Sequence, residues 1–309
     1  MPDKIIYPIE VGNDDIHIDL YIYNYLLNGF MKKECVIEFS EELYNLSSNI
    51  WEANCVLVFD LENKGKRTRI WYDYHDNPKL ALELLNQEGI YFKVFLLRKY
   101  DGMQRVLPIG VTPRIACLDN LDALRRIKNK KEYDYDVVAH FKPSDYTGRL
   151  LDFGLRAASV RIALSKKSWR VSAGIYGIVS LEIKRQLTDV IRRKLGRVEH
   201  LERQSRSKIC FGFPGAGGTT GLSSRAVEIL AIGSCLLTVE TNCLELGDFN
   251  NCYIKVKNDL SDLEEKVDYY LKHDEEREEI AHNGLEYFNK WLSPEATINY
   301  IIDSVRSRL

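Results

Sequence analysis

Short runs of apolar residues, separated by polar turn-forming segments, recur through the first part of the chain. Runs of this length with Gly, Pro, Asn or Asp at their ends predict buried strands. Between the first two runs, residues 19–30 place apolar side chains at helical spacing, and Pro78 can open a helix over 79–86. Strands that alternate with helices predict an α/β unit with a largely parallel sheet. The strands are expected at 4–11, 34–39, 55–60, 69–74, 91–98 and 106–111.

A polar and charged segment, 119–135, separates this unit from a second one in which the alternation continues. A buried strand is expected at 136–141, and the pattern of 180–206 predicts a long basic helix. We therefore expect two α/β domains, 1–125 and 126–309. The other elements expected in the second domain, outside the stretch 210–240, are strands at 169–176 and 252–256, and helices at 147–164, 262–272, 275–291 and 294–309.

The clearest local signal is the stretch CFGFPGAGGTTGLSSRAVEILAIGSCLLTVE, which begins at Cys210. It predicts a strand, a glycine-rich loop, a short helix with Ser223 or Ser224 as its cap, and a second strand. Gly217 and Gly218 lie in the loop, where the absence of side chains lets the backbone approach a ligand closely. A loop that leads into a helix N-terminus suits an anion such as a diphosphate.

Charged side chains around this loop suit a nucleotide. Arg225 lies in the first turn of the expected helix and Glu228 one turn further on, so that both can share a face. The guanidinium suits a phosphate, and the carboxylate suits the hydroxyl groups of a ribose. Lys142 and Arg149 follow the strand at 136–141, and loops after strand ends line the crevice of an open α/β sheet. The residues expected to contact the nucleotide are Lys142, Arg149, Gly217, Gly218, Ser224, Arg225 and Glu228.

Composition and charge restrict the class of protein. The 43 basic and 45 acidic residues give a net charge of −2, which argues against a dedicated nucleic-acid binder. No stretch approaches the roughly 18 apolar residues of a membrane-spanning helix, and the N-terminus has no apolar signal-peptide core. The 7 cysteines are odd in number and scattered, which is typical of reduced thiols. We expect a cytoplasmic protein.

Basic residues are dense between Lys184 and Lys208, interrupted by a few carboxylates. A run of this kind is typical of a solvated helix face. The alternative is that it contacts an anionic membrane or a nucleic acid. The same two interpretations apply to Arg149 and Arg156, which are either surface residues or cations for a leaving diphosphate.

From Ser207 to Trp291 the sequence resembles the C-terminal, nucleotide-sugar-binding domain of GT-B-fold glycosyltransferases. The matching segments are SSRAVEILAIGSCLLTVE and NDLSDLEEKVDYYLKHDEEREEIAHNGLEYF. The second segment is similar to group 1 glycosyltransferases of the spore-maturation type, and the first also resembles capsule-associated O-glycosyltransferases. One feature departs from the group 1 pattern: the E-x7-E signature is absent, because Thr220, next to Gly221, stands where its first glutamate is usual.

The resemblance implies a GT-B fold, in which two Rossmann-like domains face each other across a cleft. Residues 1–125 would form the acceptor side and 126–309 the nucleotide-sugar side. By the same resemblance, Glu228 would bind the ribose hydroxyls and Arg225 the diphosphate, assisted by backbone N–H groups around Gly217 and Gly218. GT-B enzymes do not usually need a metal, so neither a metal nor another cofactor is expected.

A general base for an inverting reaction is expected in the first domain. The candidate catalytic cluster is Asp73, His75 and Asp76, at a strand end in the segment WYDYHDNP. The alternative is that Asp76 caps the helix that follows. The loop 12–15 is a second candidate, although its two aspartates are typical of a solvated turn. A retaining reaction needs no such base, and both outcomes stay open.

These observations favour a metal-independent hexosyl- or pentosyltransferase. It would move a sugar from a UDP- or GDP-sugar to a glycan, lipid-linked, protein or small-molecule acceptor. One alternative is a non-catalytic α/β protein that binds nucleotides or nucleic acids. Another is a glycosyltransferase that acts on nucleic-acid bases and holds its substrate with the basic region 184–208.

Overall fold

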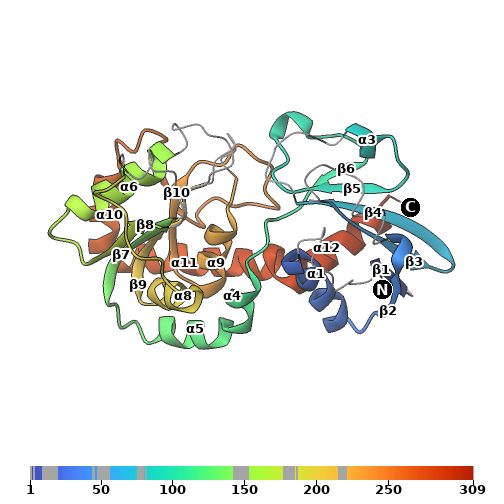
Figure 1. Cartoon of the computed structure of the whole chain (residues 1–309), viewed down its shortest axis with the longest axis horizontal. Helices are drawn as coiled ribbons and strands as arrows, with labels where there is room; N and C mark the ends of the chain where they lie inside the picture. Colours follow the sequence, from blue (N-terminus) through green and yellow to red (C-terminus); the bar gives the residue numbers. More distant parts are fainter. Residues whose placement is uncertain are drawn as a thin grey trace. The chain divides into compact units, whose positions relative to one another are not determined.

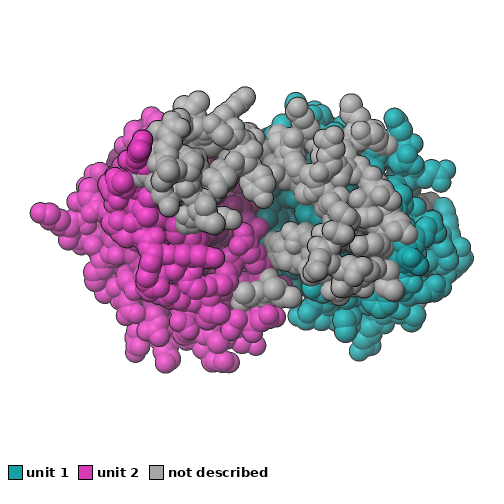
Figure 2. Space-filling model, in the orientation of Figure 1, with its two compact units in different colours: residues 1–112, 243–247, 290–309 teal, residues 113–242, 248–289 magenta. Residues whose placement is uncertain are grey.

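The computed structural model divides the chain into two compact units (Figures 1 and 2). Unit 1 comprises Met1–Thr112, Cys243–Gly247 and Lys290–Leu309, and unit 2 comprises Pro113–Asn242 and Asp248–Asn289. Each unit contains one β-sheet with helices and is described by itself. The structure describes residues 2, 4–8, 20–43, 46, 56–74, 80, 82–141, 153–176, 185, 187–214 and 221–308.

Unit 1 contains a 6-stranded sheet in the order β2-β1-β3-β4-β5-β6. Three neighbouring pairs are parallel, whereas β3 runs antiparallel to both β1 and β4. The α-helices of this unit that the structure describes are α1 (Leu20–Lys32), α3 (Leu82–Leu85) and α12 (Pro294–Arg306). The strands are β1 (Lys4–Pro8), β2 (Val36–Ser40), β3 (Val56–Asn63), β4 (Lys66–Asp73), β5 (Ile90–Lys93) and β6 (Val106–Pro108).

This sheet is mixed, where the sequence predicted a largely parallel one. The difference comes from the turn between β3 and β4, in which Lys64 and Gly65 have φ angles of 50° and 74°. Two consecutive positive φ angles match the twist of an antiparallel hairpin, so β4 folds back directly along β3. The strand predicted at 91–98 ends at Lys93, and Phe95 just beyond it adopts a φ of 59°.

The last helix, α12, packs on α1 of unit 1. At Gly29 of α1 an added Cβ would lie 2.6 Å from the carbonyl oxygen of Pro294, so glycine permits this close approach. The hydroxyl of Tyr25 donates a hydrogen bond to the backbone of Leu292 and lies 3.1 Å from the Thr297 hydroxyl. The expected division into 1–125 and 126–309 placed this helix in the second domain. The sequence of α12 itself contains no pattern that indicates its return to unit 1.

Unit 2 contains a 5-stranded, fully parallel sheet in the order β11-β10-β9-β7-β8. The chain builds outward from β7 to β8, then returns to the other side of β7 for β9, β10 and β11. The direction of winding therefore reverses between β7 and β9, and open α/β sheets bind ligands at the carboxyl ends of such strands. The strands are β7 (Tyr135–Phe141), β8 (Val171–Ile175), β9 (Ser207–Phe211), β10 (Cys235–Val239) and β11 (Ile254–Val256).

Helices cover both faces of this sheet. Residues of α6 and α10 share one hydrophobic core with Val137, Ala139 and Phe141 of β7, whereas α8 and α9 pack together on the other face. Alternate residues of a strand point to opposite faces, which directs the side chain of His140 toward α8. The helices are α4 (Ile115–Asp119), α5 (Leu121–Asn129), α6 (Phe153–Ser165), α8 (Arg197–Ser205), α9 (Ser224–Ile232), α10 (Leu263–Lys272) and α11 (Asp274–Tyr287).

Two predictions for this unit were wrong. The polar segment 119–135, expected to separate the domains, contains α5, which packs against α8 and α9. The long helix expected over 180–206 shrinks, in the part that the structure describes, to α8 at its end, because residues 187–196 form turns and a bridge from Ile191 to Ile175. The 6 cysteines in the described ranges are free thiols, as predicted, whereas Cys55 lies outside those ranges.

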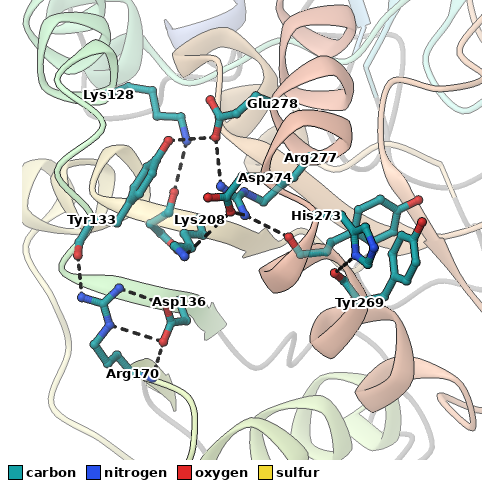
Figure 3. Close-up of polar contacts among 12 residues, drawn as sticks. Lys128, Tyr133, Asp136, Arg170, Lys208, Tyr269, His273, Asp274, Arg277 and Glu278 are labelled. Atoms are coloured by element: carbon teal, nitrogen blue, oxygen red, sulfur yellow. Dashed lines mark hydrogen bonds and ion pairs between the residues drawn. The ribbon is translucent and has the colours of Figure 1, made fainter.

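Ion pairs close the amino-terminal end of the unit 2 sheet (Figure 3). Lys128 donates to the carbonyl of Ser207 at 3.2 Å, and its ammonium lies 4.6 Å from the ring centre of Tyr133. The Tyr133 hydroxyl donates to Glu278 at 2.8 Å. Arg170, next to the core residue Trp169, forms paired hydrogen bonds with Asp136. Within the described residues, no helix is both long and apolar enough to span a membrane.

Lys93 of β5 and Asp73 of β4 form an ion pair whose side chains are both 0% exposed, with an Nζ–Oδ1 distance of 2.9 Å. Lys93→Met would leave the Asp73 carboxylate buried without its cation, which costs about 3–5 kcal/mol of unfolding free energy. The double variant Lys93→Met with Asp73→Asn should recover part of that loss, as measured by urea denaturation. Lys208→Met, which breaks an exposed pair with Asp274, is the control and should cost less than about 1 kcal/mol. A Lys93→Met protein as stable as the wild type would contradict the prediction.

Candidate functional site

Helix α9 is fixed at the carboxyl end of β9 by local features of its own sequence. The Ser223 hydroxyl accepts a hydrogen bond from the N–H of Ala226 at 3.2 Å and so caps the helix, which Ser224 begins. Gly233 ends the helix with a φ of 81°. An added Cβ at Gly212 would lie 2.4 Å from Leu236 and 3.2 Å from Ala226, so this glycine allows α9 to pack tightly on the sheet. These contacts determine where the side chains of the helix point.

Two guanidinium groups lie at the end of β7, where the sheet changes its direction of winding. Arg225 donates to the Tyr176 hydroxyl at 2.8 Å, and its guanidinium carbon lies 5.7 Å from the ring centre of Phe141. Arg156 donates to the carbonyl of Phe213 at 3.3 Å and lies 5.5 Å from the same Phe141 ring. Burial, together with the charge of Arg225, lowers the pKa of Arg156 to about 10. Arg156 therefore remains a cation at neutral pH, and the two guanidinium groups lie against the same ring.

Glu228 places a carboxylate beside these cations, and its side chain is 1% exposed. Its Oε1 accepts hydrogen bonds from the guanidinium of Arg197 on α8 and from the N–H of Arg114, which precedes α4. Its Oε2 is buried and has no hydrogen-bond partner among the described residues. Burial raises the pKa of the Glu228 carboxyl, and Arg197 is the strongest opposing influence.

Two buried histidines lie on the side of β7 that faces α8. His140 Nε2 is 2.8 Å from the Ser172 hydroxyl, to which Arg203 donates at 2.7 Å, and the ring of His200 stands perpendicular to that of His140 at 5.9 Å. Burial, with Arg203 and Arg225 as weaker influences, lowers the pKa of His140 to about 4. Burial likewise lowers the pKa of His200 well below its ordinary value. Both rings are therefore neutral at physiological pH.

Several polar atoms around α9 are buried and have no partner in the part of the chain that is described. They come from α8 and from β7 and α9, on both of which α8 packs. Buried polar groups are nearly always hydrogen-bonded, so such a group calls for a ligand, an ion or a water. A guanidinium donor and a carboxylate acceptor together suit a molecule that carries both phosphate and hydroxyl groups. The atoms are Arg225 Nη1, Glu228 Oε2, His140 Nδ1 and His200 Nε2.

The structure brings together those predicted nucleotide-binding residues that it describes, because Ser224, Arg225 and Glu228 all lie on α9. It adds Arg197 and the N–H of Arg114, which sequence reasoning missed. Arg197 stands 31 residues before Glu228 within a basic run, so no local pattern links the two. The predicted residues Lys142, Arg149, Gly217 and Gly218 lie outside the described residues.

Of the predicted catalytic cluster, the structure describes Asp73 alone, while His75 and Asp76 lie outside the described residues, as does the loop 12–15. The Asp73 carboxylate accepts hydrogen bonds from Lys93 and from the Tyr91 hydroxyl in the interior of unit 1. This arrangement suits a structural ion pair, and the assignment of a catalytic base to the cluster stays a prediction.

The described cations of the basic region 184–208 are largely engaged in pairs inside unit 2. Arg197 pairs with buried Glu228, and four others pair with carboxylates at the surface, whereas Arg192 donates to the backbone carbonyls of Asp189 and Ile191. Contact with an anionic membrane or a nucleic acid therefore stays a prediction. The surface pairs are Arg193 and Arg203 with Glu199, Arg206 with Asp134, and Lys208 with Asp274.

Comparison with known structures defines the fold as the α/β GT-B fold of glycosyltransferases. The chain matches HepE of Anabaena, solved in complex with UDP and glucose, with a TM-score of 0.53 and 10% identity over 99% of this chain and 100% of that chain. In addition, residues 164–303 match the family model described as glycosyl transferase-like. The resemblance to GT-B-fold glycosyltransferases predicted from the sequence is thus confirmed.

Other solved structures match with lower TM-scores. A glycosyltransferase of Rickettsia africae matches with a TM-score of 0.46 and 12% identity, over 91% of this chain and 87% of that chain. HepE in complex with UDP matches with a TM-score of 0.48 and 13% identity, over 74% of this chain. The chain spans 66% of that HepE chain and 48% of TarM, another match. No curated protein sequence matches the chain.

The low pKa of His140 predicts a specific dependence of stability on pH. Because the unfolded state takes up a proton near pH 6.5 and the folded state only near about 4, protonation favours unfolding. The unfolding free energy should fall as the pH drops through this interval, with His140 contributing up to about 3 kcal/mol. His140→Gln should flatten this part of the curve, measured by urea denaturation at a series of pH values. The same change at exposed His282 is the control, and equal curves for wild type and His140→Gln would refute the assignment.

Proposed function

We propose that the protein is a metal-independent glycosyltransferase that moves a sugar from a nucleoside diphosphate sugar, such as a UDP- or GDP-sugar, to an acceptor. The observation that carries the proposal is the placement of Arg225 and Glu228 on one short helix. This helix lies at the carboxyl end of a parallel sheet, next to the point where the winding reverses. The match of residues 164–303 to the glycosyl transferase-like family supports it.

In this proposal the nucleotide half of the donor lies against α9. Glu228 Oε2, which has no partner among the described residues, accepts hydrogen bonds from the ribose hydroxyls. Arg225 and Arg156 hold the diphosphate, and Arg225 Nη1 is a buried donor without a partner in the described part of the chain. Lys142, Arg149, Ser224 and the loop backbone at Gly217 and Gly218 are proposed as further phosphate contacts.

The chemistry follows from the charge that develops as the sugar leaves. Breaking the bond between sugar and phosphate leaves a diphosphate with one more negative charge, which fixed cations in a buried setting stabilise strongly. Arg225 and Arg156 supply such cations without a metal ion. An inverting reaction would also need a base from the set Asp73, His75 and Asp76. Because Asp73 is buried against Lys93, direct contact with an acceptor would fall to His75 or Asp76.

Binding of nucleoside diphosphates tests the proposal most directly. UDP or GDP should raise the melting temperature, and Glu228→Ala should weaken the binding about tenfold, because hydrogen bonds to a charged group are worth about 1.5–3 kcal/mol. Glu279→Ala, a change at an exposed position on α11, is the matched control and should bind as the wild type does. Release of free nucleoside diphosphate from a sugar nucleotide should accompany binding if the protein is an enzyme.

The alternatives predict different results in the same experiments. A non-catalytic nucleotide-binding protein would bind UDP or GDP without releasing either from a sugar nucleotide. A protein that acts on nucleic acids would be retained on DNA or RNA in a salt-dependent way. If no nucleoside diphosphate raises the melting temperature, the proposed function is wrong.

A further inference from the structure

Arg197 has a place in the site that no motif of the chain indicates. We propose that Arg197 is a positioning residue that holds the Glu228 carboxylate ionised and oriented for the ribose of the nucleotide. This inference rests on the proposed function of the same site. It concerns the first residue of α8, which lies on a different element from the two residues that would touch the nucleotide.

The division of contacts between the two carboxylate oxygens supports this role. Oε1 accepts both the Arg197 guanidinium and the N–H of Arg114, whereas Oε2 has no partner among the described residues. A ligand hydroxyl can therefore bind Oε2 while Arg197 stays in place. Contacts from α8 and from the start of α4 to the same oxygen also restrict rotation of the carboxylate about its terminal bond. The arrangement therefore indicates that Arg197 supports the Glu228 carboxylate and does not compete with the ligand for Oε2.

The charges around Glu228 indicate that Arg197 also keeps the Glu228 carboxylate ionised. Arg114 and Cys117 of the α4 segment, Arg197 of α8 and Arg225 of α9 act on the carboxylate. Arg225 is directed toward Tyr176 and Phe141, and Cys117 is a buried thiol whose pKa is raised by burial. Arg197 forms the ion pair with Glu228, so it is the cation that offsets burial of the carboxylate most directly.

A double-mutant cycle on UDP and GDP binding tests this coupling. Arg197→Met should weaken binding about tenfold, the effect of losing a hydrogen bond to a charged group. The same change should have little effect in a Glu228→Gln background if Arg197 acts through Glu228. Arg197→Lys, which retains the charge, should restore part of the affinity. Arg206→Met is the matched control, because Arg206 pairs with the exposed carboxylate of Asp134.

The dependence of binding on pH separates positioning from a general structural effect. Without the Arg197 cation the pKa of Glu228 should rise. As the pH is lowered, the Arg197→Met protein should therefore begin to lose affinity for UDP at a higher pH than the wild type does. Glu228→Gln, which cannot ionise at this position, should lose this dependence. Tighter binding of UDP by Arg197→Met, or full additivity of the two substitutions, would overturn the proposal.

A measurement on the ligand-free protein separates failure of this inference from failure of the proposed function. The carbon-13 signal of the Glu228 carboxyl, identified by its absence in Glu228→Gln, can be followed against pH. It should titrate at a higher pH in Arg197→Met than in the wild type, and an unchanged titration refutes the coupling. A wild-type protein that binds neither UDP nor GDP refutes the nucleotide site itself, whatever the titration shows.

Discussion

The burial of a single carboxylate, that of Glu228, constrains how unit 2 is built. A charge that is 1% exposed needs cations or hydrogen-bond donors around it, because burial strongly disfavours the ionised form. Here α8 contributes Arg197 and the segment before α4 contributes the N–H of Arg114. The packing of α4 on α8 and of α8 on α9 holds both groups beside the carboxylate.

Buried polar groups lie at both ends of the unit 2 sheet. At the amino-terminal end, the Tyr133 hydroxyl donates to Glu278, and Arg277 pairs with Glu278 while its Nε has no partner among the described residues (Figure 3). At the carboxyl end, Arg225 and Glu228 each keep one buried atom without a partner among the described residues. Open α/β sheets bind ligands at the carboxyl ends of the strands where the direction of winding reverses, which here is between β7 and β9. The topology of the sheet and the buried atoms of Arg225 and Glu228 therefore indicate the same place for a ligand.

Sequence predicted those parts of the structure that depend on near neighbours. The helix cap, expected at Ser223 or Ser224 and found at Ser223, follows from signals a few residues apart. The end at Gly233 and the common helix of Arg225 and Glu228 do so as well. Features that depend on distant contacts escaped it. The pairing of Arg197 with Glu228 joins residues 31 positions apart, and the contact of Tyr25 in α1 with Leu292, just before α12, joins residues 267 positions apart. The β3–β4 hairpin was missed because charged residues around its turn resemble a loop.

The ion pairs of the basic region 184–208 are relevant to the choice between the proposed functions. Its density of Lys and Arg suggested a surface for phosphate backbones or anionic lipid, yet Arg193, Arg203 and Arg206 have carboxylate partners within unit 2. A cation that is already paired with a carboxylate attracts a nucleic acid less strongly. The affinity for a nucleic acid depends on how many of its phosphates are neutralised by Lys and Arg, because each such contact releases counterions. Arg197, by contrast, faces inward to the Glu228 carboxylate, beside the Arg225 Nη1 donor that has no partner among the described residues. The count of Lys and Arg in this region therefore overstates the charge that it offers at the surface, where Arg192 donates to backbone carbonyls.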